Sequence, residues 1–331
     1  MNTSCNANAD STVILSFFII GCILTIIGTV LNLCSCLLFC RSKSLVNMPY
    51  SVFIIALSIA DIVKLTAEYS VHILFFYIQH PYFVCSISWF LTMTSENTSY
   101  AFLCALGIER NLKVWSTDRR SLITKRDATI ITIFIIIFTI LFSCDNAYYN
   151  AYGYTFSLTN LLFIENIGLN NLILPLIIIS TNIILIFGLQ RRSQQRRHRL
   201  GTYKNDDWKE RSVILYMLLS SIAFILLTSP IGILGAWSAI HSQRIPTNNL
   251  ALILDLLEII HHCSHFPILL MTSSVIRKKT FEIIFHPRTK RQNSVLSRNS
   301  IRQRITSQSS STRGSNRAQF RSPLKSISTN S

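Results

Sequence analysis

Charged side chains inside long apolar runs are the residues of this sequence that could do chemistry. Asp61 and Lys64 stand in one such run, and Glu109 and Arg110 close another. A charge surrounded by hydrocarbon is costly, so each of these residues is a candidate for a functional site. Because Lys64 lies one helical turn from Asp61, we expect the two to form a buried ion pair.

The elements that must position these side chains are the apolar runs themselves. Seven of them are comparable with the roughly 20 residues that a helix needs to cross a bilayer. Only helices or closed barrels satisfy the backbone in lipid, and the runs lack the alternating pattern of barrel strands. We therefore predict an all-α membrane protein with a seven-transmembrane helix bundle. The runs cover about 13–41, 50–78, 83–108, 127–146, 168–190, 211–238 and 249–273.

Basic residues indicate how the bundle is oriented. The net charge is +16, and most Lys and Arg residues lie in the connections at 41–49, 110–126 and 191–210 or near the C-terminus. Basic loops stay on the cytoplasmic side, so we expect a plasma-membrane protein with its N-terminus outside. Zinc-finger spacing and aromatic RNA-binding signatures are missing from the sequence. The expected partner of this charge is anionic membrane lipid, not nucleic acid.

The two ends of the chain are polar. We expect an extracellular N-terminus at 1–12, the seven-helix domain at 13–275 and a short amphipathic eighth helix at 276–286 that lies at the membrane surface. Residues 287–331 contain no acidic residue and are rich in Ser and Arg. Such a composition cannot bury enough apolar surface to fold, so this segment is predicted to be a disordered cytoplasmic tail.

Four carboxylates fall in the outer halves of their runs when the rise per residue of a helix is counted. They are Glu68, Glu96, Asp255 and Glu258. Set against Lys64, this excess of negative charge favours a cationic extracellular ligand. The alternative is that Glu68 merely pairs with Lys64 four residues earlier and that Glu258 bonds nearby histidines.

Histidines near Glu258 raise the possibility of metal chemistry. His261 and His265 share a helix face at the four-residue spacing of some metal ligands. Neither an HExxH pattern nor a third clear ligand accompanies them, so we expect no metal, no cofactor and no enzyme activity. The alternative functions are an intramembrane enzyme or a transporter, although the two halves of the chain show no internal similarity.

Several of these residues occur in the order and at the depth found in one receptor family. Cys85 precedes Arg110 by 25 residues, which at about 1.5 Å per residue is nearly the membrane thickness. Over about residues 13–285 the sequence resembles the rhodopsin-like G-protein-coupled receptors. The matching positions are Asn32, Asp61, Cys85, Glu109, Arg110 and the expected helix kinks Pro175, Pro230 and Pro267.

The resemblance implies an activation switch at the cytoplasmic face. Arg110 is expected to pair with Glu109 and with Glu210, which stands where the family often has an acidic partner on helix six. Release of this clasp would let helix six move outward and activate a heterotrimeric G protein. The alternative is an interfacial salt bridge of little energetic weight.

A second implied site surrounds Asp61. In the family this carboxylate binds sodium together with a serine of helix three, which is Ser99 here. Asn32 of helix one is expected to belong to the same helix-packing region. Helix seven offers His262 in place of the usual oxygen ligands, and imidazole suits a hard cation poorly. We therefore favour a pair between Asp61 and Lys64 over a sodium site.

The resemblance also narrows the ligand and the outer contacts. Amine receptors carry Asp where this chain has Thr92, so the expected ligand is a peptide with a basic group. Cys85 is expected to form a disulfide with Cys144, while Cys5 or no bridge stay as alternatives. Hydroxyls beside basic residues in the tail imply kinases and, after phosphorylation, arrestin as partners.

Overall fold

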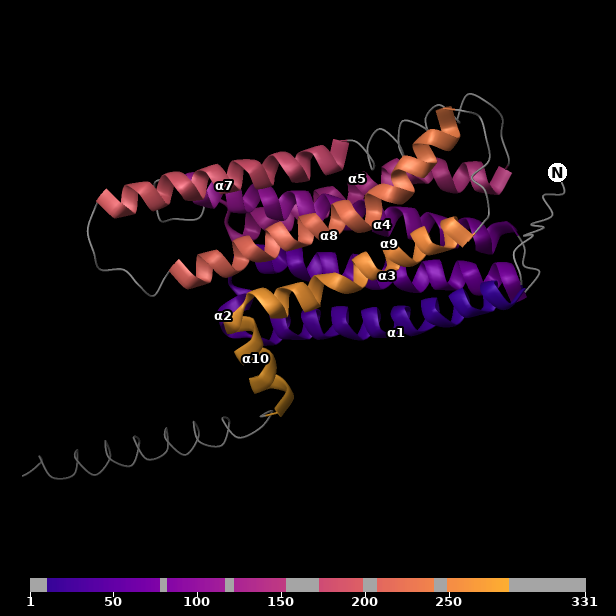
Figure 1. Ribbon diagram of the computed structural model, residues 1–331, viewed down its shortest axis with the longest axis horizontal. Helices are drawn as coiled ribbons and strands as arrows, with labels where there is room; N and C mark the ends of the chain where they lie inside the picture. Colours follow the sequence, from indigo (N-terminus) through magenta and orange to yellow (C-terminus); the bar gives the residue numbers. More distant parts are fainter. Residues whose placement is uncertain are drawn as a thin grey trace, which may run out of the picture. The chain divides into compact units, whose positions relative to one another are not determined.

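The computed structural model describes residues 11–77, 82–116, 122–152, 173–198, 207–240 and 249–285. Within these ranges every regular element is a helix, which confirms the predicted all-α fold (Figure 1). The long helices of this part are α1 (Ser11–Arg41), α3 (Pro49–Tyr77), α4 (Tyr82–Trp115), α5 (Lys125–Tyr152), α7 (Leu174–His198), α8 (Asp207–Ile240) and α9 (Asn249–Thr272). The short ones are α2 (Lys43–Val46) and α10 (Ser274–Phe285).

Six of the described helices are long and apolar enough to cross a membrane. The exception among the long helices is α4, which carries Glu96, Glu109 and Arg110. It contacts α3, α5, α7 and α8, so its polar side chains face neighbouring helices instead of lipid. The central place of α4 explains how a helix with these charges can belong to a seven-helix membrane bundle.

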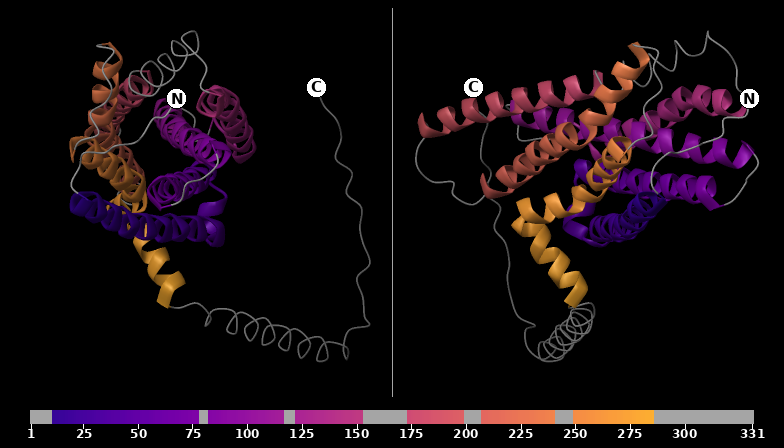
Figure 2. Two further views of the ribbon diagram at one scale, coloured as in Figure 1. Left: turned by 90° about the vertical axis from the view of Figure 1, so that its right-hand side faces the viewer. Right: turned by 45° about the vertical axis from the view of Figure 1, so that its right-hand side comes forward.

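The helices pack side by side within one compact unit that ends at Thr280, as two further views show (Figure 2). α1 packs against α3 and α9, and α8 packs against α9. Gly28 allows the close approach of α1, because a Cβ atom there would overlap Cys263 Sγ in α9 and Leu65 Cδ1 in α3. These contacts bring the polar residues of α1, α3, α4 and α9 into one region.

Helix ends follow local chemistry. α5 begins at a capping box, in which the backbone N–H of Thr124 donates to Asp127 Oδ2 at 2.9 Å and the Asp127 N–H donates to Thr124 Oγ1 at 3.3 Å. α9 ends where Arg277 Nη1 donates to the carbonyls of Leu270 and Met271 at 2.9 and 2.6 Å. Such contacts satisfy backbone groups that have no partner inside the helix.

The structure differs from the sequence-based boundaries most clearly in three helices, of which α7 runs to His198 and not only to about residue 190. α4 runs to Trp115 and does not stop at Arg110, and α5 extends to Tyr152. The predicted eighth helix is confirmed as α10, in which Ile276 is buried and Phe281 is exposed. The predicted tail at 287–331 and most of the N-terminus at 1–12 lie outside the described residues, so their boundaries stay predictions.

Candidate functional site

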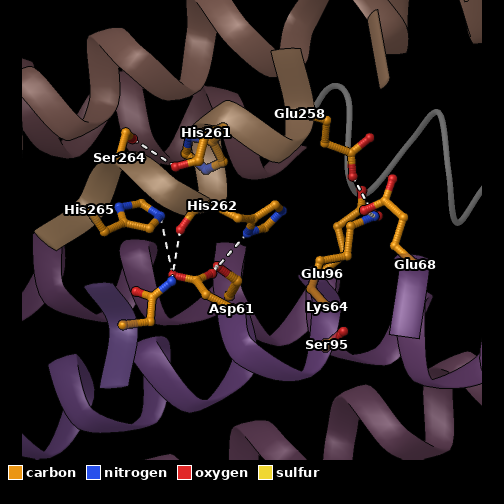
Figure 3. A network of polar contacts seen from close by, with 12 residues as sticks. Asp61, Lys64, Glu68, Ser95, Glu96, Glu258, His261, His262, Ser264 and His265 are labelled. Carbon is orange, nitrogen blue, oxygen red and sulfur yellow. Dashed lines mark hydrogen bonds and ion pairs between the residues drawn. The ribbon is translucent and has the colours of Figure 1, made fainter. Parts of the chain in front are cut away.

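The polar centre of the bundle is built around the side chain of Lys64 in α3. Its Nζ lies 2.8 Å from Glu96 Oε2 in α4, 2.5 Å from Glu258 Oε1 in α9 and 3.5 Å from Glu68 Oε2 one turn along α3. Figure 3 shows the three carboxylates converging on this ammonium group. The Lys64 cluster, by which we mean these four residues, therefore ties three helices together.

Acidic groups outnumber basic groups at the Lys64 cluster. Three carboxylates share one ammonium group, and half-buried Asp255 also interacts electrostatically with Lys64 and Glu68. Buried charges are stable only when they are paired or when protons or further cations compensate them. The arrangement can therefore accept an additional positive group.

Thr92 lies in α4, one turn before Glu96. Its side chain is 3% exposed, and its hydroxyl has no hydrogen-bond partner among the described residues. The five predicted pocket residues are thus all described. Four of them interact with Lys64.

One expectation about these charges was wrong, and so was one part of the alternative reading. Lys64 does not pair with Asp61, because its ammonium group is held by the three glutamates. Glu258 does not bond the nearby histidines through its Oε1, which faces Lys64. The other part of that alternative, a pair between Lys64 and Glu68 at four-residue spacing, is confirmed.

Asp61 instead forms a second polar centre with residues from α4 and α9. Its Oδ1 accepts a hydrogen bond from Ser99 Oγ at 2.7 Å and lies 2.8 Å from His262 Nδ1. Its Oδ2 lies 3.7 Å from His265 Nε2. Asn32 Nδ2 donates to the carbonyl of His262 at 3.0 Å. The three predicted residues Asn32, Asp61 and Ser99 therefore lie together, and His262 contacts two of them.

The residues around Asp61 do not suit a sodium ion. Sodium prefers oxygen ligands, yet both carboxylate oxygens of Asp61 face imidazole nitrogens of His262 and His265. Asp61, His262 and Ser99 are completely buried, each with an exposed fraction of 0%. A hydrogen-bonded carboxylate and imidazole pair accounts for Oδ1 of Asp61, whereas Oδ2 has no hydrogen-bond partner among the described residues.

Arg110 is held near the C-terminal end of α4 and the N-terminal end of α3. Its Nε lies 3.0 Å from Glu109 Oε2, and its guanidinium carbon lies 4.2 Å from the centre of the Tyr50 ring. The next residue, Asn111, donates through Nδ2 to the carbonyl of Thr181 in α7 at 2.7 Å. The pair with Glu109 is as predicted, and the stacking on Tyr50 is an unpredicted contact of the switch.

Glu210 belongs to α8, but its side chain lies outside the described residues. The proposed clasp between Glu210 and Arg110 therefore stays a prediction. Pro230 and Pro267 lie inside α8 and α9, whereas Pro175 occupies the first turn of α7 as the structure describes it. The prolines are thus placed as predicted in α8 and α9.

The predicted disulfide between Cys85 and Cys144 is not formed at Cys144, the cysteine of this pair whose side chain the structure describes. Cys144 is a free, exposed thiol, and the side chain of Cys85 lies outside the described residues. Among the groups that the structure describes, no set of three or more His, Cys, Asp or Glu side chains could hold a metal ion. The histidines of α9 are instead packed on one another and on Tyr100 and Phe224.

Comparison with known proteins identifies one family. The family model described as 7 transmembrane receptor (rhodopsin family) matches residues 31–269, which include every residue of the two polar centres. No curated protein matches the chain.

Proposed function

Because the chain belongs to the rhodopsin family of seven-transmembrane receptors, we propose that it binds an extracellular ligand with a cationic group and activates a heterotrimeric G protein. The ligand site in this proposal consists of Glu68, Glu96, Asp255 and Glu258, beside Thr92. The family match favours a receptor over the alternatives of a transporter or an intramembrane enzyme. Receptors of this kind are multi-pass membrane proteins.

The observation that carries the ligand proposal is the charge excess at the Lys64 cluster. One ammonium group serves three carboxylates from α3, α4 and α9. A guanidinium or ammonium group from outside would offset the remaining negative charge, and electrostatic attraction would steer it toward the site. A peptide with a basic side chain is the ligand class that we propose, since Thr92 stands where amine receptors of the family carry Asp.

The effector side of the proposal rests on Arg110. Its contacts with Glu109 and Tyr50 hold the guanidinium in one position, and an acidic partner at Glu210 would add a tie to α8. A ligand that binds better when α8 lies farther out would shift the population toward that state and free Arg110 for a G protein. In this proposal the basic ends of the helices face the cytoplasm, where anionic lipid meets them.

Kinases and arrestin are proposed as partners of the tail. The hydroxyl-rich and basic composition of residues 287–331 supports this proposal, and the segment itself lies outside the described residues. Phosphates added there would give a basic segment mixed charge and change its partners.

The proposal is tested in cells that express the full chain with an epitope tag at each end. A library of amidated peptides is applied in matched pairs, in which Arg or Lys is replaced by Gln, and calcium and cyclic AMP are recorded. We expect responses only to basic members of the pairs, and antibody access only to the N-terminal tag before permeabilisation. Equal responses to the neutral members would contradict the cationic site, and access to the C-terminal tag would contradict the topology.

A further inference from the structure

Lys64 occupies the place that the cationic group of a ligand would need. Its Nζ lies 2.8 Å from Glu96 and 2.5 Å from Glu258, which are distances for direct ion pairs. A second positive group cannot approach the same oxygens closely while this ammonium group remains between them, because like charges repel strongly in a region of low dielectric. Ligand binding and the ties of Lys64 to α4 and α9 therefore exclude each other.

The carboxylates are more accessible than the ammonium group that they hold. The side chains of Glu68 and Glu96 are 12% and 15% exposed, whereas the side chain of Lys64 is 3% exposed. A cation that enters the cluster thus meets the glutamates before it meets Lys64. This order of access suits exchange of one cation for another.

A buried histidine gives a second, independent sign of a ligand. His262 is 0% exposed, and its Nε2 has no hydrogen-bond partner among the described residues. Its other nitrogen faces Asp61 at 2.8 Å, so the ring stands between Asp61 and the Lys64 cluster, as Figure 3 shows. The ring interacts electrostatically with Lys64 and Glu96, and a buried nitrogen without a partner is costly unless a further group satisfies it.

We propose that Lys64 is a resident competitor of the ligand, and that a primary ammonium or guanidinium group binds Glu96 and Glu258 by displacing Lys64 Nζ from them. Lys64 keeps Glu68, its partner on the same helix, so the displaced side chain still has a counter-ion. The ion pairs of Lys64 with Glu96 in α4 and Glu258 in α9 are lost, and the ligand takes them over. This deepens the proposed receptor function and rests on it for its biological meaning, although the exchange of cations can be measured without any signalling.

The test is chemical rescue of the full-length protein carrying Lys64→Ala. This change deletes three methylene groups and the ammonium, and propylammonium supplies the same atoms. Thermal unfolding of the purified receptor is followed at equal, low ionic strength in three salts: propylammonium chloride, guanidinium chloride and tetramethylammonium chloride. The control is Lys278→Ala, which deletes the same atoms from an exposed lysine of α10.

We expect Lys64→Ala to unfold at a lower temperature than the natural chain, and propylammonium to raise its midpoint by at least about 2 °C over tetramethylammonium. The natural chain and Lys278→Ala should show no such difference at the same concentration. A triple variant that adds Glu96→Gln and Glu258→Gln should lose the response. Absence of a propylammonium effect on Lys64→Ala, or an equal effect on Lys278→Ala, would overturn the proposal.

Lys64→Ala could fail to fold because it leaves several carboxylates without a counter-ion. Purification is therefore run with and without propylammonium, and recovery only in its presence counts as rescue. If neither condition yields protein, the double variant Lys64→Ala with Glu258→Gln is used, which carries one carboxylate fewer. Its midpoint should still rise with propylammonium through Glu96, and no rise would refute the exchange while leaving the receptor assignment intact.

Discussion

The imidazole of His262 lies against the carboxylate of Asp61, with Nδ1 2.8 Å from Oδ1. The contact joins α9 to α3 in the centre of the bundle, and both side chains are fully buried. Ser99 completes the contacts of the same oxygen from α4. Oδ1 of this carboxylate therefore has both of its partners supplied by the protein itself.

Sodium should therefore have no specific effect on this receptor. Replacing about 150 mM choline chloride with sodium chloride is expected to leave the thermal midpoint of the purified protein unchanged, because imidazole nitrogens occupy both sides of Asp61. The double change His262→Ser with His265→Asn supplies oxygen ligands and should create a sodium-dependent rise. A rise already present in the natural protein would show that our account of Asp61 is mistaken.

Tyr50 should restrain Arg110 through the face of its ring, which lies 4.2 Å from the guanidinium carbon. Tyr50→Leu removes the aromatic face, and loss of about 0.5–1 kcal/mol of cation–π attraction should raise ligand-free G-protein activation about two- to fivefold. Tyr50→Phe keeps the face and is expected to behave like the natural protein. Equal basal activity of the Leu and Phe variants at matched surface expression would argue against this role.

Gly28 should tolerate no side chain. A methyl group at this position would overlap atoms of Cys263 and Leu65, so Gly28→Ala is expected to cost about 1–3 kcal/mol of stability. The matched control is Gly21→Ala in the same helix, where the nearest atoms would lie at ordinary distances of 3.9 and 4.0 Å. Thermal midpoints and surface expression of the two variants make the comparison, and equal values would contradict the tight packing of α1 on α9.

The seven helices and the eighth could be predicted because the apolar runs and the basic loops are properties of local sequence. The pair of Lys64 and Glu68 was also predictable, since a spacing of four residues fixes a shared helix face. The apolar criterion fails at α4, because a helix surrounded by others can carry charges that a lipid-facing helix cannot.

The contacts of Lys64 with Glu96 and Glu258 were beyond sequence reasoning. Each depends on the rotation of α4 and α9 about their axes, and no spacing within one helix reports it. The position of His262 near Asp61 could be predicted, because the family resemblance places both residues at one site. Imidazole is a poor ligand of sodium but a strong hydrogen-bond partner of a carboxylate, and the second property explains its contact with Asp61.

Glu210 should restrain the switch from α8. Glu210→Ala removes the proposed acidic partner of Arg110 and is expected to raise ligand-free G-protein activation, whereas Lys209→Ala beside it should leave this activity unchanged. Nucleotide exchange on a purified heterotrimer, with receptor amounts matched, gives the comparison. Identical basal rates of nucleotide exchange in the two variants would contradict a pair between Arg110 and Glu210.

The most direct test compares the potency of one basic peptide from the library on the natural receptor and on variants in which an amide nitrogen replaces one carboxylate oxygen. Glu96→Gln and Glu258→Gln keep the shape of the site but remove a charge, so the concentration for half-maximal G-protein activation should rise at least about tenfold for each. Glu282→Gln, an exposed residue of α10, should leave it unchanged. Unaltered potency in both glutamine variants, at equal surface expression, would show that the cation is not captured at these carboxylates.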